Sequence, residues 1–173
     1  MELADEGDLL KKIKEHKRNG TIFLESEIWS IFIQVVNALK VLHSMGILHR
    51  DIKSSNILLS HNFRVKLGDF NISKIIKDCL ATTQTGTPYY ASPEIWREEE
   101  YGPKSDIWSL GCVLYEATTL ELPFKAADMN ELHKVIEEGS YIKVQRYNDI
   151  AKMIACLLQV LPKYRPSCGI PCL

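Results

Sequence analysis

The sequence lacks the features of a membrane, secreted or nucleic-acid-binding protein. Charged residues interrupt its apolar stretches well before the length of a membrane span is reached. Residues 1–6 are acidic, where a secretory signal peptide would be basic. With 21 basic and 22 acidic residues the net charge is -1, so the chain as a whole does not attract nucleic acid or an anionic membrane surface. We therefore expect a cytoplasmic protein with no membrane insertion and no nucleic acid partner.

Paired cysteines are missing as well. The 5 cysteines are odd in number and none forms a Cys-x-x-Cys pair, which argues against a disulfide framework or a zinc site. Cys168 and Cys172 resemble half of a metal site, but the chain has no second pair to complete it. We interpret all of them as reduced thiols.

The sequence contains no repeat, low-complexity tract or interdomain linker. Its 173 residues are 46% apolar and 25% charged, which is typical of one soluble domain with a core. Apolar residues spaced three and four apart predict a helix over 26–44 that Gly46 ends. Further helices are expected over 9–18 with Asp8 as cap, over 105–119 with an acidic first turn, and over 149–161, ended by Pro162.

Strands are expected only in a short apolar hairpin, 57–59 and 65–67, joined by residues 60–63. The polar stretch 77–87 shows no period and is interpreted as a loop. Pro88, Pro93 and Pro103 are expected to exclude long regular structure from the region that follows. The fold class is therefore mainly α, with a small β component (α+β).

The most informative segment is the run His-Arg-Asp-Ile-Lys-Ser-Ser-Asn at 49–56, followed by Asp69 beyond the hairpin. The hairpin is expected to return Asp69 to the side of Asn56. Carboxylate and amide oxygens are ligands that Mg²⁺ accepts, and a separate carboxylate such as Asp51 could receive a proton from an attacking hydroxyl. The residues therefore indicate phosphoryl transfer from a magnesium-bound triphosphate.

This segment resembles the catalytic loop and magnesium loop of eukaryotic protein kinases. Gly-Thr-Pro-Tyr-Tyr-Ala-Ser-Pro-Glu at 86–94 resembles their substrate-docking loop, with Ser92 in place of the usual alanine. Ser-Asp-Ile-Trp-Ser-Leu-Gly at 105–111 and Tyr-Arg-Pro at 164–166 resemble later elements of the large lobe, or C-lobe. Segments such as Leu-Pro-Phe-Lys-Ala at 122–126 are most similar to the NIMA-related (Nek) serine/threonine kinases.

The resemblance implies a partial kinase domain over 1–173, consisting of the hinge and C-lobe, with a catalytic loop at 49–56 and an activation segment at 69–94. The sequence has no Gly-x-Gly-x-x-Gly, no Val-Ala-Ile-Lys strand and no partner glutamate, so the N-lobe is expected to be absent. From the same resemblance we expect the last helix of a complete C-lobe to be missing. We expect this polypeptide alone to be inactive or nearly so.

The family resemblance also implies roles for individual residues. The cofactors would be ATP and Mg²⁺, and the substrates would be protein Ser/Thr hydroxyls. Asp51 would be the base, Lys53 would neutralise the transferring phosphoryl group, and the Thr87 hydroxyl would bridge the two. Asn56 and Asp69 would bind the metal. Nucleotide contacts would come from Glu2, Ala4, Asn56, Leu58 and Asp69.

Regulation and structural support follow from the same resemblance. Arg50, with help from Lys74, would bind a phosphate placed on the activation segment by an upstream kinase or by trans-autophosphorylation. The candidate acceptors are Thr82, Thr83 and Thr85, with Thr83 preferred. His49 and Phe70 would belong to an internal stack, Glu94 and Arg165 would form a buried ion pair, and Asp106 would accept hydrogen bonds from the catalytic-loop backbone.

One position departs from the family and two alternatives stay open. The family motif Asp-Phe-Gly is replaced by Asp-Phe-Asn at 69–71, and we expect Asn71 to alter loop switching without loss of metal binding.

The chain could instead be an inactive kinase-like binding module or regulator. It could also be a small-molecule phosphotransferase, although Lys53 and the docking loop argue against that. Members of the family are often found at centrosomes, basal bodies and cilia, but no residue here encodes such a location.

Overall fold

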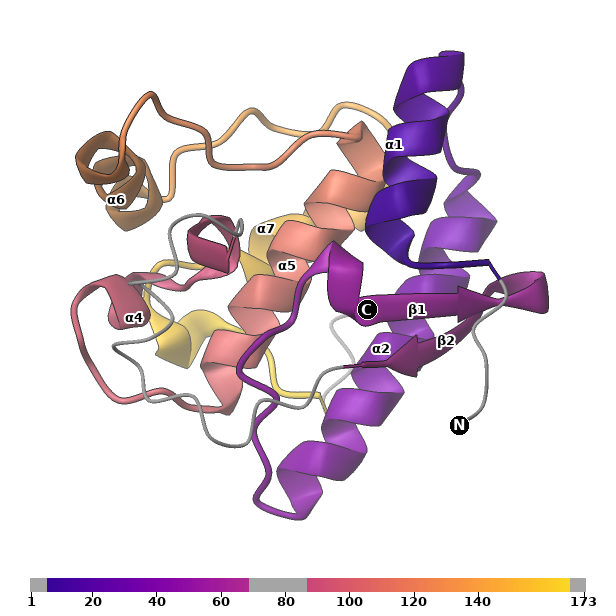
Figure 1. Cartoon of the computed structure of the whole chain (residues 1–173). Helices are drawn as coiled ribbons and strands as arrows, with labels where there is room; N and C mark the ends of the chain where they lie inside the picture. Colours follow the sequence, from indigo (N-terminus) through magenta and orange to yellow (C-terminus); the bar gives the residue numbers. More distant parts are fainter. Residues whose placement is uncertain (1–5, 69–86, 169–173) are drawn as a thin grey trace.

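The computed structural model describes residues 6–68 and 87–168 and is mainly helical (Figure 1). The helices are α1 (Leu9–Asn19), α2 (Glu25–Ser44), α4 (Pro93–Trp96), α5 (Pro103–Thr119), α6 (Met129–Glu138) and α7 (Asn148–Leu157). The strands are β1 (Ile57–Ser60) and β2 (Arg64–Leu67), and short 3₁₀ turns are η1 (Ser54–Asn56), η2 (His61–Phe63), η3 (Thr87–Tyr90) and η4 (Pro162–Tyr164). The prediction of a mainly α fold with a small antiparallel sheet is confirmed.

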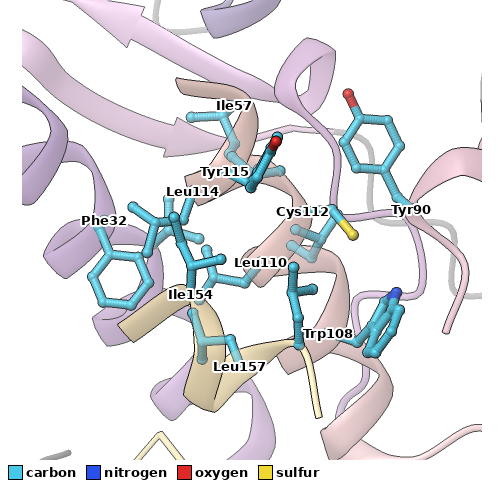
Figure 2. Packing of buried hydrophobic residues seen from close by; sticks show 14 of the residues in the cluster. Phe32, Ile57, Tyr90, Trp108, Leu110, Cys112, Leu114, Tyr115, Ile154 and Leu157 are labelled. Atoms are coloured by element: carbon cyan, nitrogen blue, oxygen red, sulfur yellow. The ribbon is translucent and has the colours of Figure 1, made fainter. Parts of the chain in front are cut away.

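Helix α5 runs through the middle of the molecule and is buried on all sides (Figure 1). It packs against α7, α2 and α1. Figure 2 shows Phe32 from α2 and Ile154 and Leu157 from α7 beside Leu110 and Leu114 of α5. Contact with α7 is close because Gly111 has no side chain: a Cβ there would lie 2.9 Å from the Cβ of Leu157. The central helix thus supports α1, α2 and α7, as well as η3 and η4.

Helices α1 and α2 form where the sequence signals predicted them. The Asp8 carboxylate accepts a hydrogen bond from the Lys11 amide at 2.8 Å, and Gly20 ends α1 with a φ of 65°. On α2 the expected apolar stripe faces the core, with Ile28, Phe32, Val35 and Leu39 buried. None of the helices that the structure describes combines the length and apolar character needed to cross a bilayer.

The hairpin follows η1 and is fixed to the helices on both sides. Its strands pair antiparallel, with Ile57 opposite Leu67 and Ser60 opposite Arg64. The Gln34 side chain on α2 holds the second strand, since it donates to the Phe63 carbonyl at 2.8 Å and accepts from the Val65 amide at 3.0 Å. On the other edge the Leu59 amide donates to the Gly7 carbonyl at 2.8 Å. These contacts fix the position of η1 and the loop before it.

One helix was missed, and the predicted end of another was wrong. Helix α6 was not predicted, although Asp128 caps it and Gly139 ends it in a left-handed conformation. Helix α7 ends at Leu157 and not at 161, and Pro162 begins η4 instead of closing the helix. As expected, no long regular element lies between Pro88 and Pro103, where only η3 and the four-residue α4 occur. Pro93 and Pro103 occupy the first positions of α4 and α5, where a missing amide hydrogen costs nothing.

Candidate active site

Asp51 is the centre of the candidate site. It lies on the loop between α2 and η1 and is 5% exposed. The Lys53 ammonium lies 2.9 Å from its Oδ2, and the Asn56 side-chain amide donates to the same oxygen at 3.0 Å. The Asn56 amide also donates to the Asp51 carbonyl at 2.8 Å. A buried carboxylate is therefore held between a cation and an amide, in a fixed orientation.

The loop around Asp51 is anchored by Asp106 in the first turn of α5. The carboxylate of Asp106 accepts from the backbone amides of His49 and Arg50 at 3.1 and 3.0 Å. It also bonds the His43 ring at 2.8 Å and the Tyr101 hydroxyl at 2.6 Å. Burial alone would raise the pKa of Asp106, but these donors outweigh it and hold the pKa below its usual range. An ionised carboxylate thus fixes the backbone just before Asp51.

Arg50 has a left-handed backbone conformation, with a φ of 66°. Non-glycine residues rarely adopt it, so the surrounding bonds must hold it there. The bond from its amide to Asp106 supplies one such constraint. The preceding residue, His49, is fully buried, and its Nδ1 accepts a weak bond from the Asp51 amide at 3.4 Å. The sequence therefore turns sharply at Arg50 and directs Asp51 towards Lys53 and Asn56.

Asn56 is the one proposed metal ligand among the described residues. Its side-chain nitrogen is engaged with Asp51, and the carbonyl oxygen is the atom that an amide offers to a cation. The Gly68 amide donates to the Asn56 carbonyl at 2.8 Å, so the hairpin returns the chain to Asn56 immediately before position 69. Across the described parts of the chain, no group of three or more His, Cys, Asp or Glu side chains could hold a metal ion.

A buried polar network links the loop to the segment that follows position 87. The Tyr90 hydroxyl donates to Glu116 at 2.6 Å and lies 3.1 Å from the Ser54 hydroxyl. Burial raises the pKa of Tyr90 well above its usual range, and the adjacent Glu116 charge adds to the shift. Burial also raises the pKa of Glu116, against the hydrogen bonds from Tyr90 and Ser54. Through Ser54, Tyr90 and Glu116 the network joins η1, η3 and α5 next to the loop that carries Asp51.

Glu94 and Arg165 lie together although they are distant in the sequence. The guanidinium bonds both carboxylate oxygens, at 2.6 and 2.8 Å, and both side chains are almost completely buried. Arg165 also donates to the carbonyls of Gln159, Lys104 and Val160. Burial alone would raise the pKa of Glu94, but the bonds and charge of Arg165 lower it overall. The pair ties α4 to the end of the described chain.

Several residues assigned from the sequence are not described. The proposed residues Glu2, Ala4, Asp69, Phe70, Lys74, Thr82, Thr83 and Thr85 lie outside the described ranges, as do Asn71 and Cys172, and the Thr87 side chain is not described either. Leu58 is half-buried on β1.

Other residues of the site were missed by sequence reasoning. His43, Tyr90, Tyr101 and Glu116 were given no role, although each bonds a group at or below the candidate site. Glu116 could have been noticed, because it is a lone charge in the apolar run 110–117. The other three gave no comparable signal. The partners of His43 and Tyr90 are distant in sequence, and no pattern marks the contact of Tyr101 with Asp106.

Comparison with known proteins agrees with this geometry. Residues 1–170 match the family model described as the protein kinase domain. The chain is 46% identical over 175 residues to the probable serine/threonine-protein kinase nek3 of Dictyostelium discoideum, and 44% identical over 172 residues to the serine/threonine-protein kinase Nek5 of Homo sapiens. Each alignment covers 96% of this chain, but only 16% and 24% of the two relatives.

The chain therefore spans less than a quarter of the length of these two Nek relatives. The match to the kinase domain model nevertheless extends over nearly all of its residues. On that basis, this chain belongs to the protein kinase family and is similar to its Nek serine/threonine kinases.

Proposed function

We propose that this protein is a serine/threonine kinase that transfers the γ-phosphate of ATP to hydroxyl groups of other proteins. The observation that carries the proposal is the Asp51 carboxylate, held between the Lys53 ammonium at 2.9 Å and the Asn56 amide at 3.0 Å. A positioned base and a nearby cation are what phosphoryl transfer requires of the protein.

In this mechanism Asp51 orients the attacking hydroxyl and accepts its proton as the new bond to phosphorus forms. Lys53 orients Asp51 through their ion pair and places a positive charge where negative charge develops on the transferring group. Thr87 would connect these two residues to the docking segment. Since Asp106 fixes the backbone of His49 and Arg50, the position of Asp51 is set before any substrate binds.

Mg²⁺ and ATP are the proposed cofactors, and the described residues fit them in part. Asn56 offers a hard oxygen ligand, and Asp69 is the second proposed ligand for the metal. When bound, Mg²⁺ would neutralise charge on the phosphate oxygens. Leu58 on β1 is a further proposed contact for the nucleotide, and Glu2 and Ala4 are the proposed hinge contacts.

The substrate would dock on the segment around η3. Tyr90 is fixed there from two directions, because its hydroxyl bonds Glu116 and its carbonyl accepts from the Ser109 hydroxyl at 2.8 Å. Such a rigid platform suits a peptide, whereas a small-molecule substrate would not need it. We therefore retain protein Ser/Thr side chains as the substrate class.

Arg50 is the proposed receiver of an activating phosphate. Within the described residues its guanidinium makes no hydrogen bond or ion pair, and Arg50 is a partly buried residue of the catalytic loop. Phosphorylation of Thr83, or of Thr82 or Thr85, by an upstream kinase or in trans would give Arg50 and Lys74 a common anion.

The proposed location is the cytoplasm, with association with centrosomes, basal bodies or cilia suggested only by family resemblance.

The test is phosphate transfer from radiolabelled Mg-ATP to a peptide library that contains serine and threonine. It is made with this chain joined to the N-lobe of a Nek relative, because the chain alone is expected to be inactive or nearly so. Asp51→Asn should lower the rate by roughly 10²–10⁴-fold, because it removes the base but keeps the shape. Asp149→Asn on α7 is the matched control, since that carboxylate is 60% exposed and pairs only with Lys152. Activity of Asp51→Asn within about twofold of the unmodified protein would contradict the role of Asp51.

A second candidate is a kinase-like binding module that docks peptides without transferring phosphate. The anchored Tyr90 supports it, since the bonds to Glu116 and Ser109 involve no nucleotide group. It predicts peptide binding with the same affinity in the presence and absence of Mg-ATP, and no incorporated label. Label incorporation that depends on Asp51 would exclude this candidate.

A further inference from the structure

A cysteine, a histidine and an aspartate contact one another in series, from Cys168 through His43 to Asp106. The Cys168 sulfur lies 3.8 Å from Nδ1 of His43, and Nε2 of the same ring lies 2.8 Å from the Asp106 carboxylate. The three side chains come from the segment after η4, from α2 and from α5. The proposed kinase mechanism makes no use of the cysteine.

The ring between the sulfur and the carboxylate is oriented by its two bonds. Because Asp106 is buried and ionised, Nε2 of His43 must donate to it, which leaves Nδ1 facing the sulfur. The pKa of His43 is raised to about 9, first by its bond to Asp106 and next by its bond to Cys168. At neutral pH the sulfur therefore has a cation as its neighbour, which is the electropositive surrounding in which reactive cysteines are found.

The cluster opens onto a cavity of about 320 Å³. Its lining includes Lys40, His43, Ser44, Lys104, Ser167 and Cys168. Lys104 is held in place by a bond to the Ser167 hydroxyl at 2.9 Å. The walls carry positive charge and hydroxyl groups, and no carboxylate is among the lining residues, so the cavity suits a small anionic molecule.

We propose that Cys168 is a reactive thiol that exchanges with a small disulfide carrying carboxylates, such as glutathione disulfide, and that His43 is its positioning residue. The Cys168 thiolate attacks one sulfur of the disulfide, and the disulfide bond breaks as the new sulfur–sulfur bond forms. The departing thiolate takes a proton from solvent. Cys168 is oxidised to the mixed disulfide, and the second half of the reagent is reduced to a thiol.

Two other cysteines of the described chain provide internal comparisons. Cys156 on α7 is also partly buried, but it is not among the residues that line this cavity. Cys112 on α5 is completely buried, and burial raises the pKa of its thiol far above the usual range. Cys156 therefore measures the reactivity of a thiol without the cluster, and Cys112 reports whether the protein has opened.

The experiment follows glutathione uptake by the reduced chain at pH 7, with peptide mass spectrometry reporting each cysteine separately. Cys168 should react at least about threefold faster than Cys156, because its sulfur is positioned by His43 and the cationic walls of its cavity attract the carboxylates of the reagent. His43→Gln should remove this difference. Lys40→Gln should slow the reaction with glutathione disulfide but not with the uncharged hydroxyethyl disulfide.

Two results would overturn the proposal. One is a rate at Cys168 no greater than that at Cys156 in the unmodified protein. The other is an unchanged rate in His43→Gln while Cys112 stays unreactive, which would show that the folded variant does not need the ring. Because the comparison within the unmodified protein requires no substitution, unfolding of the variant cannot obscure the answer.

Discussion

At the scale of single residues, the bond between His43 and Asp106 makes stability depend on pH. The pKa of His43 in the folded protein, about 9, lies above the usual value of 6.5 for a histidine side chain. The stabilisation is therefore fully present below about pH 6.5 and is lost as the pH rises through 9. We expect the Tm to fall across this window, by roughly 2–4 °C for each kcal/mol lost in a domain of this size.

The measurement is thermal unfolding between pH 6 and 10 for the unmodified protein and for His43→Gln. The difference between their Tm values should shrink as the pH rises, because the variant has no charge to lose. His61→Gln is the matched control, since its side chain is 80% exposed, and it should follow the unmodified protein. A constant difference between the unmodified protein and His43→Gln would mean that the ring contributes only packing.

Glu94 and Arg165 lead to a second prediction at the same scale. Arg165→Met should lower the free energy of unfolding by roughly 3–5 kcal/mol, because it leaves the buried Glu94 carboxylate without its counter-charge. Urea denaturation gives this value directly. Glu94→Gln combined with Arg165→Met should recover part of the loss. Arg97→Met removes a partly exposed pair with Glu137 and should cost only about 0–1 kcal/mol.

At the scale of elements, the packing of α5 on α7 depends on the absence of a side chain at Gly111. A Cβ at this position would lie 2.8 Å from Cδ2 of Leu158 and 2.9 Å from the Cβ of Leu157. Gly111→Ala should therefore destabilise the protein by about 1–3 kcal/mol through overpacking, measured by urea denaturation. Gly102→Ser, at a position with open space, should leave stability unchanged or slightly higher. Equal stability of both variants would refute close packing at Gly111.

The same scale shows which elements could be predicted from the sequence. Helices α1 and α2 were predictable because their caps and apolar stripes are local signals. Helix α6 had comparable signals and was missed: Asp128 accepts from the Glu131 amide at 2.8 Å, and Glu131 accepts from Ala127 at 3.0 Å. The end of α7 was less predictable, because the Gln159 and Val160 carbonyls accept from Arg165 outside the helix.

Some contacts of the candidate site could likewise be predicted from the sequence, and others could not. The segment 49–56 is continuous in sequence, so the grouping of Asp51, Lys53 and Asn56 could be inferred from spacing and family resemblance. The bonds from Tyr90 to Glu116 and from Cys168 to His43 join residues that only the tertiary fold brings together. Such contacts cannot be predicted from local patterns, because the residues around one partner carry no information about the position of the other.

At the scale of the whole molecule, Asp106 connects two regions. One oxygen of its carboxylate accepts from the Arg50 amide, and the other accepts from the His49 amide and bonds the His43 ring. The ring in turn contacts Cys168. The Cys168 thiol, through His43, and the loop that carries Asp51 are therefore both connected to the Asp106 carboxylate. A change in the bond between His43 and Asp106 alters how strongly Asp106 can accept from the loop amides.

This connection gives a final prediction, which rests on the proposed reactivity of Cys168. A glutathione adduct would place carboxylates beside the His43 cation, where they compete with Asp106 for it. We expect the adduct to loosen the bonds from Asp106 to the His49 and Arg50 amides. Hydrogen exchange at these amides should rise by roughly two- to tenfold, the range that corresponds to losing about 0.5–1.5 kcal/mol of hydrogen bonding.

Hydrogen exchange followed by NMR would measure both amides before and after modification. The Lys12 amide, which bonds Asp8 at the start of α1, is the internal control and should not change. Cys168→Ser treated with the same disulfide should exchange like the unmodified protein. Because the two amides bond the carboxylate directly, an adduct that left their exchange unaltered would show that His43 and the loop use Asp106 independently, and the thiol would then have no path to Asp51.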